Sequence, residues 1–465
     1  MRNFTLILAL SFFLYGCPRT SQYVRPGLPA PPDWPASSAA GAGAPGAPAA
    51  GDLKWREYFT DQRLQSVIEL ALGNNRDLRA ATLNVERVQA LYRIQRAELY
   101  PTVVASASAD AYRVPRTLSG ADDNETVAQL TVGLGMASWE LDLFGRIRSL
   151  KSAALEQYLA TEQARSAAQI SLIAAVANSY LALAADREDL KLAQETLAAQ
   201  QASYELILRI REAGMTSDLE LRQAQSAVDA ARVDIARYSG QLVVNENALN
   251  LLAGAPVTSN LLADDLSNVG DLKEIAPGLP SDLLLRRPDI LAAEHQLKAA
   301  NANINAARAA FFPRVALTAA AGVTSNDLTN LFKPAAGTWN FAPQVVLPIF
   351  DSGARRAGYA VATVDRDISV AEYENAIQAA FREVSDALSL RITLTEQQQA
   401  LQSLIDTLQE TYRLSEARYT GGIDSYLNVL VAQRSVYARQ QQMVGLRLAR
   451  LSNLVALYKV LGGGV

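Results

Sequence analysis

The feature that most constrains this sequence is a unit that it contains twice. DLRAA at 77–81 precedes Pro101 at the same spacing at which DILAA at 289–293 precedes Pro313. Further matches follow in the same order: 143–146 with 349–355, 211–214 with 418–421, and 224–226 with 432–435. The sequence therefore predicts an internal tandem repeat.

The repeat divides the chain into five parts. We expect a lipoprotein signal peptide over 1–16, a lipidated tether over 17–51, a first repeat over 52–254, a linker over 255–280 and a second repeat over 281–465. The tether is rich in proline, alanine and glycine, a composition typical of an extended linker.

The first residues have the pattern of an export signal. Arg2 precedes an apolar stretch that ends at Leu14-Tyr15-Gly16-Cys17. This ending resembles a bacterial lipobox, in which the cysteine carries S-diacylglycerol and an N-acyl chain. Pro18, in place of an aspartate, resembles the signal for forwarding to the outer membrane. The alternative is an ordinary signal peptide with a chance cysteine. Downstream of it we find no uninterrupted run of about 18 apolar residues, so no transmembrane helix is expected.

Each half contains two segments in which apolar and polar residues alternate, the pattern of a half-buried strand. They lie at about 102–112, 127–139, 314–324 and 338–349. Each is close to the length of about ten residues that a tilted strand needs to cross a bilayer. The alternative is a soluble four-stranded sandwich, which the export signal and the helical remainder disfavour.

The rest of each half has heptad spacing. Apolar residues recur every seven positions from Val176 to Tyr204, from Leu221 to Leu249 and from Leu430 to Tyr458. Such spacing is typical of helices that coil around one another. A helix over 143–211 would be about 100 Å long, which suits a duct across the periplasm. The predicted fold class is mixed α+β, mostly α.

Four strands cannot close a membrane barrel, because the smallest such barrels have about eight. An open sheet edge in lipid would leave backbone N–H and C=O groups without partners. Copies of the chain must therefore combine their strands. Two copies would supply about eight strands and three about twelve, and only the larger number leaves an open lumen.

The duplicated unit with two glycine-turn hairpins resembles the TolC-type outer-membrane efflux factors. Further stretches are similar to the NodT-type lipoprotein branch, which serves tripartite resistance-nodulation-division drug efflux systems: the lipobox, YVRP at 23–26, WELDLFGR at 139–146, LRRPDI at 285–290, LPIFD at 347–351, RYTGG at 418–422 and GGG at 462–464. The resemblance covers essentially the whole mature chain. It implies a homotrimer whose twelve-stranded outer-membrane β-barrel, four strands per chain, continues into a coiled-coil periplasmic α-barrel. It also implies an equatorial belt that includes 255–280.

Several chemistries are excluded by composition. The formal net charge of −4 gives no reason to expect nucleic acid. Cys17 is the only cysteine and His295 the only histidine, which excludes disulfides, Cys/His metal clusters and Ser-His-Asp catalysis. No glycine-rich phosphate loop is present. We expect no enzyme activity, no metal and no cofactor beyond the lipid on Cys17.

The hairpin ends at 209–220 and 418–434 are the candidate functional site. In the resembling family these ends close the periplasmic mouth through a leucine, an acidic residue and an arginine. Leu427 and Arg434 match, but Val431 stands at the acidic position. The turn residues are Gly214, Gly421 and Gly422, and the gate candidates are Leu427, Val431, Arg434, Asp424, Arg418, Asp218 and Glu220.

Three interpretations of these ends stay open. An ionic seal would pair charges between chains through Arg434 or Arg418. An apolar seal would use Leu427 and Val431. Alternatively, these charges are only the solvated end of a hairpin.

The sequence predicts the outer-membrane channel of a tripartite efflux pump in a Gram-negative bacterium, lipid-anchored, extending into the periplasm and passively exporting drugs and other small molecules. Expected partners are two further copies, a periplasmic membrane-fusion adaptor, an inner-membrane resistance-nodulation-division transporter and outer-membrane lipid. One alternative is the duct of a type I protein secretion system. Another is a structural or adhesive coiled-coil lipoprotein, which the four strands disfavour.

Overall fold

The computed structural model describes residues 23–27, 29, 31, 53–120, 124–270, 272–273 and 281–464. Cys17 and the predicted signal peptide lie outside this part of the chain. Two compact units are present. The first combines Met1–Gly27, Val85–Thr161 and Ala292–Tyr373, and the second combines Leu28–Asn84, Glu162–Leu291 and Glu374–Val465.

The elements of the first half are α3 (Trp55–Tyr58), α4 (Gln62–Asn74), α5 (Arg76–Ala97), β1 (Val103–Val114), α6 (Arg116–Ser119), β2 (Glu125–Leu141), α7 (Arg146–Glu212) and α8 (Asp218–Ala253). After the short turns η2 (Ser259–Leu261), η3 (Leu266–Asn268) and η4 (Ser281–Arg286) come α9 (Pro288–Ala309), β3 (Arg314–Ser325), η5 (Pro334–Ala336), β4 (Gly337–Val346), α10 (Ala354–Thr420) and α11 (Tyr426–Val460). The order helix, two strands, long helix, second helix therefore occurs twice. The two long helices, α7 and α10, each contain 67 residues.

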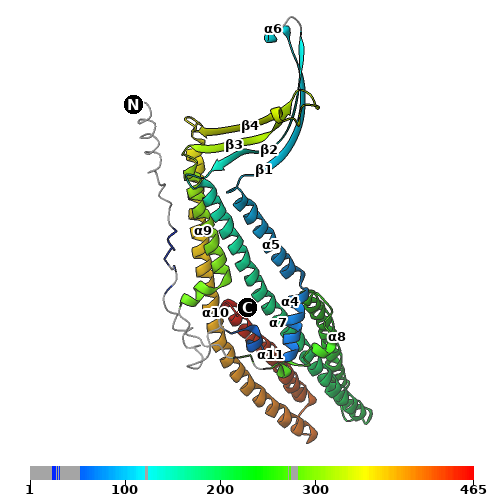
Figure 1. Ribbon diagram of the computed structural model, residues 1–465. Helices are drawn as coiled ribbons and strands as arrows, with labels where there is room; N and C mark the ends of the chain where they lie inside the picture. The colour runs from blue at the N-terminus through cyan, green and yellow to red at the C-terminus, as the bar shows by residue number, and fades with distance from the viewer. Residues whose placement is uncertain are drawn as a thin grey trace. The chain divides into compact units, whose positions relative to one another are not determined.

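The four strands of the first unit form one antiparallel sheet in the order β1-β2-β3-β4 (Figure 1). The prediction of a mixed, mostly helical fold is confirmed. Two strand ends differ from the sequence pattern. β2 is longer than 127–139, and β4 ends at Val346 rather than at 349. Pro348 explains the early end, because proline has no N–H to donate and restricts the residue before it.

The two middle strands approach each other closely at a pair of glycines. Gly133 of β2 lies opposite Gly322 of β3. A Cβ atom on Gly322 would lie 2.3 Å from the carbonyl oxygen of Val132, so no larger residue fits there. Further along, the register shifts between Met136 and Trp139, which marks a β-bulge in β2.

Ion pairs join the sheet to its helices within the first unit. Glu140 at the end of β2 accepts two hydrogen bonds from Arg146 at the start of α7, at 2.9 and 2.8 Å, and lies 3.2 Å from Arg314 of β3. The rings of Phe144 and Phe312 stack with centroids 4.9 Å apart beside these groups. These contacts fasten the start of α7 to the end of β2 and the start of β3.

A short N-terminal segment is bound to α9 in the same unit. Arg25 donates two hydrogen bonds to the buried carboxylate of Glu294, at 3.1 and 2.6 Å, and the Tyr23 hydroxyl donates a third at 3.2 Å. Lys298 adds an ion pair at 3.2 Å. Burial alone would raise the pKa of Glu294, but the hydrogen bonds from Arg25 and Lys298 outweigh it and lower that pKa. The segment is therefore anchored by charge as well as by packing.

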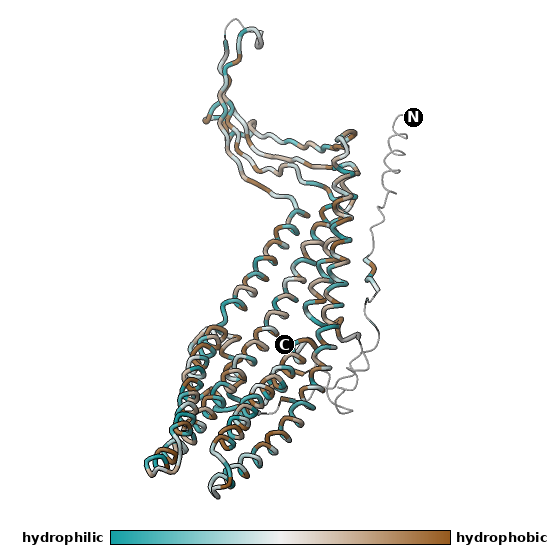
Figure 2. The backbone as a smooth tube through the Cα atoms, turned by 180° about the vertical axis from the view of Figure 1, so that it is seen from behind, coloured by the Kyte–Doolittle hydropathy of each residue, from teal (hydrophilic) through white to brown (hydrophobic). Residues whose placement is uncertain are grey.

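The long helices carry mixed faces, as heptad spacing predicts. Figure 2 shows hydrophobic and hydrophilic residues alternating along them. Among the described residues α7 alone is long and apolar enough to span a membrane by length and composition, with a stretch of mean hydropathy 1.5 that is half buried. Polar residues such as Asn178 interrupt the apolar residues of this helix, so they form no unbroken run. Ile173, Val176 and Tyr180 are buried in the second unit, as expected of a core helix.

Arg287 is a buried arginine of the second unit with three partners. Its guanidinium donates to Asp289 at 2.7 Å, to Glu383 of α10 at 2.9 Å and to the Val460 carbonyl at the end of α11 at 2.7 Å. Burial alone would raise the pKa of Asp289, but Arg287 lowers it. The segment 285–290, which the sequence analysis singled out, therefore connects α9, α10 and the C-terminal end of α11.

Candidate gate at the hairpin ends

The first hairpin end joins α7 to α8 in the second unit. Gly214 has φ of 74°, the left-handed conformation that favours glycine after a helix. The Met215 N–H donates to the Ile210 carbonyl at 3.0 Å and completes the turn. Ser217 caps α8 by accepting a hydrogen bond from the Glu220 N–H at 3.3 Å. The predicted turn glycine therefore lies where the backbone requires it.

The second hairpin end joins α10 to α11 and has a similar design. Gly422 has φ of 72°, and the Ile423 N–H donates to the Arg418 carbonyl at 2.9 Å. Gly421 has an ordinary backbone conformation, but a Cβ there would lie 3.3 Å from the Ala417 carbonyl oxygen. The local backbone therefore explains why both positions of the second turn are glycine: Gly422 has a positive φ, and Gly421 has little space for a Cβ atom.

The charged gate candidates pair within their own hairpins. Arg211 lies 2.9 Å from Asp218, and Arg418 lies 3.0 Å from Asp424. Asp424 also accepts a hydrogen bond from Asn428 at 2.7 Å, and Glu220 accepts one from Thr216. The hydrogen bond from Arg418 is the main cause of the lowered pKa of Asp424. In the described chain these charges pair across the turns of their own hairpins.

The two hairpins are joined just above their ends by a small core. It contains Ile207 of α7, Ala224 and Ala227 of α8, and Tyr426, Val429 and Leu430 of α11. Tyr419 packs edge-on against Tyr426 with centroids 5.6 Å apart, and burial raises the pKa of both phenols. Sequence reasoning missed these tyrosines. Their signal was their position beside the turn glycines.

One face of α11 stays open. Leu427 and Val431 are 46% and 55% exposed, and Arg434 follows at the next turn of the same face. Arg434 makes a long hydrogen bond of 3.4 Å to Ser226 of α8. Met215, Leu219 and Ile423 are also exposed at the hairpin ends. The apolar gate candidates are therefore accessible, whereas most of the charged ones are engaged locally.

A polar cluster fastens α8 to α11 and also to α7, where Asn245 of α8 donates a hydrogen bond to Asp186. The Tyr437 hydroxyl donates to Asp234 at 3.1 Å, and Gln441 donates to the Tyr238 hydroxyl at 2.9 Å. Burial, together with the nearby Asp186 and Glu188, raises the pKa of Asp189 to about 6. The Asp189 Oδ1 atom is buried, and no hydrogen-bond donor in the described chain reaches it.

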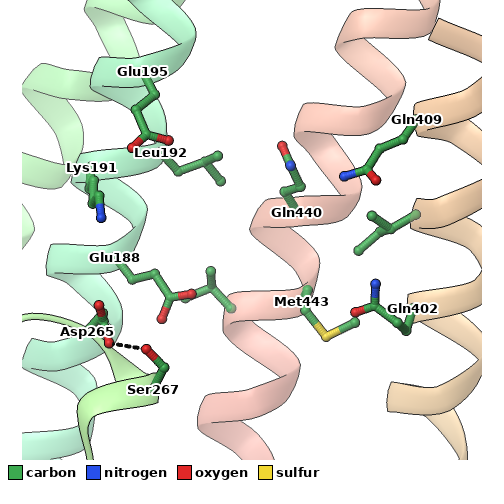
Figure 3. Close-up of a pocket in the computed structure, with 12 residues that line it drawn as sticks. Glu188, Lys191, Leu192, Glu195, Asp265, Ser267, Gln402, Gln409, Gln440 and Met443 are labelled. Atoms are coloured by element: carbon green, nitrogen blue, oxygen red, sulfur yellow. Dashed lines mark hydrogen bonds between the residues drawn. The ribbon is translucent and has the colours of Figure 1, made fainter. Parts of the chain in front are cut away.

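A groove of about 370 Å³ lies between α7, α10, α11 and the segment around η3 (Figure 3). Glu188, Lys191 and Glu195 form one wall, and Gln402, Gln409, Gln440 and Met443 form the other. Glu188 is held by Arg447 at 2.7 Å and by the Leu266 N–H at 3.1 Å. The side chains of the groove are mostly polar. At its edge the Ser267 hydroxyl donates a hydrogen bond to Asp265.

In the described part of the chain, no group of three His, Cys, Asp or Glu side chains is placed to hold a metal ion. His295 lies in α9, with Nδ1 2.6 Å from Glu156 of α7. This contact joins two helices of the first unit.

Comparison with known proteins gives consistent matches along the chain. The family model described as outer membrane efflux protein matches residues 67–255 and 279–463. A probable efflux pump outer membrane protein of Pseudomonas putida, TtgC, is 46% identical over 465 residues, which is 100% of this chain and 96% of that protein. The outer membrane protein OprJ of Pseudomonas aeruginosa is 40% identical over 460 residues, 99% of this chain and 95% of that protein.

Two solved structures of membrane proteins have the same fold. A membrane protein from Pseudomonas aeruginosa superposes with a TM-score of 0.90 at 40% identity, covering 96% of this chain and 98% of that one. The open state of the Neisseria gonorrhoeae MtrE outer membrane channel superposes with a TM-score of 0.88 at 38% identity, again covering 96% and 98%.

Proposed function

Because this chain belongs to the outer membrane efflux protein family, we propose that three copies of it close one channel through the outer membrane. The chain is the outer-membrane channel component of an efflux pump, as its sequence predicted. The barrel would contain about twelve strands, four from each copy, and would continue into the helices α7, α8, α10 and α11.

The open edges of the sheet carry this proposal. In the described chain β1 and β4 each have one neighbouring strand, so one side of each strand leaves its backbone groups unpaired. Each unpaired N–H or C=O group would cost several kcal/mol in lipid. The side chains of β4 are exposed along the whole strand, including Trp339 and Phe341. Joining β4 of one copy to β1 of the next removes both edges.

Native mass spectrometry of the full chain in detergent tests the proposed assembly. We expect a complex of three chains that conducts ions in a planar bilayer. A folded, conducting monomer would contradict the closure argument, because a single four-stranded sheet cannot enclose a lumen.

We also infer that the two halves descend from one duplicated unit. The equal lengths of α7 and α10 and the repeated order of elements support this inference.

The names of the relatives support a proposal about the partners and the cargo. We propose that a periplasmic membrane-fusion adaptor and an inner-membrane resistance-nodulation-division transporter complete the pump. Relatives are named as toluene, solvent and antibiotic efflux proteins, so we propose small apolar molecules as cargo. Deleting the gene should raise intracellular accumulation of such compounds, and restoring the chain should reverse the effect. These names favour drug efflux over type I protein secretion.

We propose that the hairpin ends form the periplasmic gate and that its seal is mainly apolar. Leu427 and Val431 are exposed on one face of α11, whereas Asp424, Arg418 and Asp218 pair inside their own hairpins. An ionic seal would first have to break these pairs. An apolar face needs no such exchange, and three copies of it around a narrow mouth would exclude water.

A further inference from the structure

The sheet of the first unit has one polar and one apolar face. Residues that pair across neighbouring strands share a face, and so do residues two positions apart in one strand. Glycines and side chains with a hydroxyl or amide group lie on one face: Ser106, Ser108, Thr131, Gly133, Thr318, Gly322 and Asn340. Aliphatic and aromatic side chains lie on the other: Leu130, Val132, Leu134, Leu317, Val323 and Phe341. Because lipid contacts the apolar face of a membrane barrel, the polar face lines the lumen of the proposed channel.

A pocket of about 370 Å³ lies on this polar face, where the strands meet α7 and α9 of the same unit. Glu140 of β2, Ala316 of β3 and Gln344 of β4 pair side by side across it. Ala316 lies two residues before Thr318 and therefore on the polar face. The volume is within the range of sites that bind small molecules. The pocket therefore borders the path that cargo takes through the proposed channel.

Part of the pocket wall is apolar. The rings of Phe144 and Phe312 stack there with an angle of 13° between their planes. Val346 at the end of β4 is 48% exposed, and Pro348 also lines the pocket. An aromatic molecule in the pocket therefore contacts aromatic and aliphatic side chains, and aromatic contacts contribute more than the area that they bury.

The polar part of the wall has an excess of positive charge. The carboxylate of Glu140 lies between two guanidinium groups, those of Arg146 at 2.8 Å and Arg314 at 3.2 Å. Asp142 also lines the pocket, but Arg148 pairs with it at 3.0 Å. The cluster of Glu140, Arg146 and Arg314 therefore keeps one positive charge that no carboxylate in it balances.

Arg314 is the guanidinium that can take up an anion. Its side chain is 58% exposed, against 27% for Arg146, which donates to Glu140 through two nitrogens. Arg314 approaches Glu140 through Nε, so the two terminal nitrogens still have N–H groups to donate. A guanidinium binds a carboxylate through two parallel hydrogen bonds when both groups have this freedom.

We propose that this pocket is a resting site for cargo on the lumen wall and that it takes small aromatic molecules with a carboxylate. The ring packs against Phe144 and Phe312, and the carboxylate accepts hydrogen bonds from Arg314. The inference rests on the proposed function, because it names a class of cargo for the same channel. Binding at such a site must be weak, since a conduit has to release what it holds.

Ligand-observed fluorine NMR with para-fluorobenzoate tests the pocket in the full-length protein in detergent. We expect saturable broadening of the probe signal with the parent protein. Ala316→Leu places a larger side chain inside the pocket and should abolish the broadening. Ala320→Leu is the matched control, because Ala320 is exposed on the same face of β3 and does not line the pocket. This variant should bind the probe as the parent does.

A charge variant tests the class of ligand. Arg314→Gln should weaken binding of para-fluorobenzoate about tenfold, because it removes the charge-assisted hydrogen bonds. Arg113→Gln, which changes an exposed arginine of β1 on the apolar face, should leave the affinity unchanged. Para-fluorotoluene has the same ring without the carboxylate. It should bind the parent more weakly, and Arg314→Gln should not change its affinity.

Each contrary result has a definite meaning. No saturable broadening with the parent, or equal broadening with Ala316→Leu, would overturn the site. Equal affinity of the parent and Arg314→Gln for para-fluorobenzoate would overturn the preference for carboxylates.

Efflux by the restored deletion strain separates this inference from the proposed function. If the chain restores efflux but binds no probe, only the pocket assignment fails. If the chain binds the probe but does not restore efflux, the proposed function fails, and the role of the pocket in carrying cargo fails with it.

Discussion

Val431 lies between Leu427 and Arg434 on an exposed face of α11. Replacing both apolar residues, as Leu427→Ser with Val431→Ser, should raise the planar-bilayer conductance, because a hydroxyl-lined mouth admits water more readily. Leu219→Ser, which changes another exposed leucine at a hairpin end, is the matched control and should leave conductance unchanged. A rise in Asp424→Ala with Arg434→Ala, and not in the serine pair, would instead indicate an ionic seal.

Arg287 connects three segments of the second unit through one side chain. Arg287→Ala should lower the free energy of unfolding by about 3 kcal/mol, since it leaves Asp289, Glu383 and the Val460 carbonyl without their shared donor. The neighbouring Arg286 is exposed, so Arg286→Ala should stay within about 0.5 kcal/mol of the parent. Thermal unfolding in detergent compares the two. Equal losses of unfolding free energy in the two variants would show that the buried contacts of Arg287 do not stabilise the fold.

At the scale of elements, Asp189 of α7 should make the folding stability of the region where α7 contacts α8 depend on pH. Its pKa is about 6 in the folded chain, while an unfolded aspartate has a pKa of about 3.9. Between these values the folded state binds more protons than the unfolded state. Stability therefore falls as pH rises through this window, and the loss is complete above about pH 6.

Asp189→Asn should remove this pH dependence and stabilise the protein at pH 7.5 by about 1 kcal/mol, a figure reduced for partial exposure. Melting temperatures recorded from pH 4.5 to 7.5 measure the effect. Asp229→Asn, which changes an exposed carboxylate of α8, is the control and should keep the parent profile. An unchanged slope in Asp189→Asn would assign the dependence to another group.

At the scale of the whole molecule, we propose that lipid and barrel both anchor the chain. Cys17 lies shortly before Tyr23 in the sequence, and Tyr23 and Arg25 are bound to Glu294. Intact-mass measurement of the purified protein should show a mature N-terminus at Cys17 with S-diacylglycerol and an N-acyl chain. Each acyl chain of the attached lipid adds about 0.8 kcal/mol of membrane affinity per buried CH₂. The Cys17→Ser variant should lack this added mass, and a mature N-terminus elsewhere would rule out the anchor.

The local structure of this protein is determined by its sequence at short range. Alternating residues placed all four strands, heptads placed the long helices, and Gly214 and Gly422 marked turns where the backbone is left-handed. Short sequence motifs likewise predicted which helices of the two halves correspond. Each of these patterns consists of residues that lie close together in the chain.

Only the tertiary structure decided which faces and charges meet. The heptad pattern marked Tyr437 as a packing position, but its hydroxyl bonds to Asp234, 203 residues away. The sequence left Arg418 and Asp424 available to pair between chains, and the turn brings them together within one hairpin. Burial of Asp189 likewise comes from neighbouring helices. Short-range periodicity fixes how a helix or strand forms, whereas the environment of a side chain depends on distant segments that periodicity does not place.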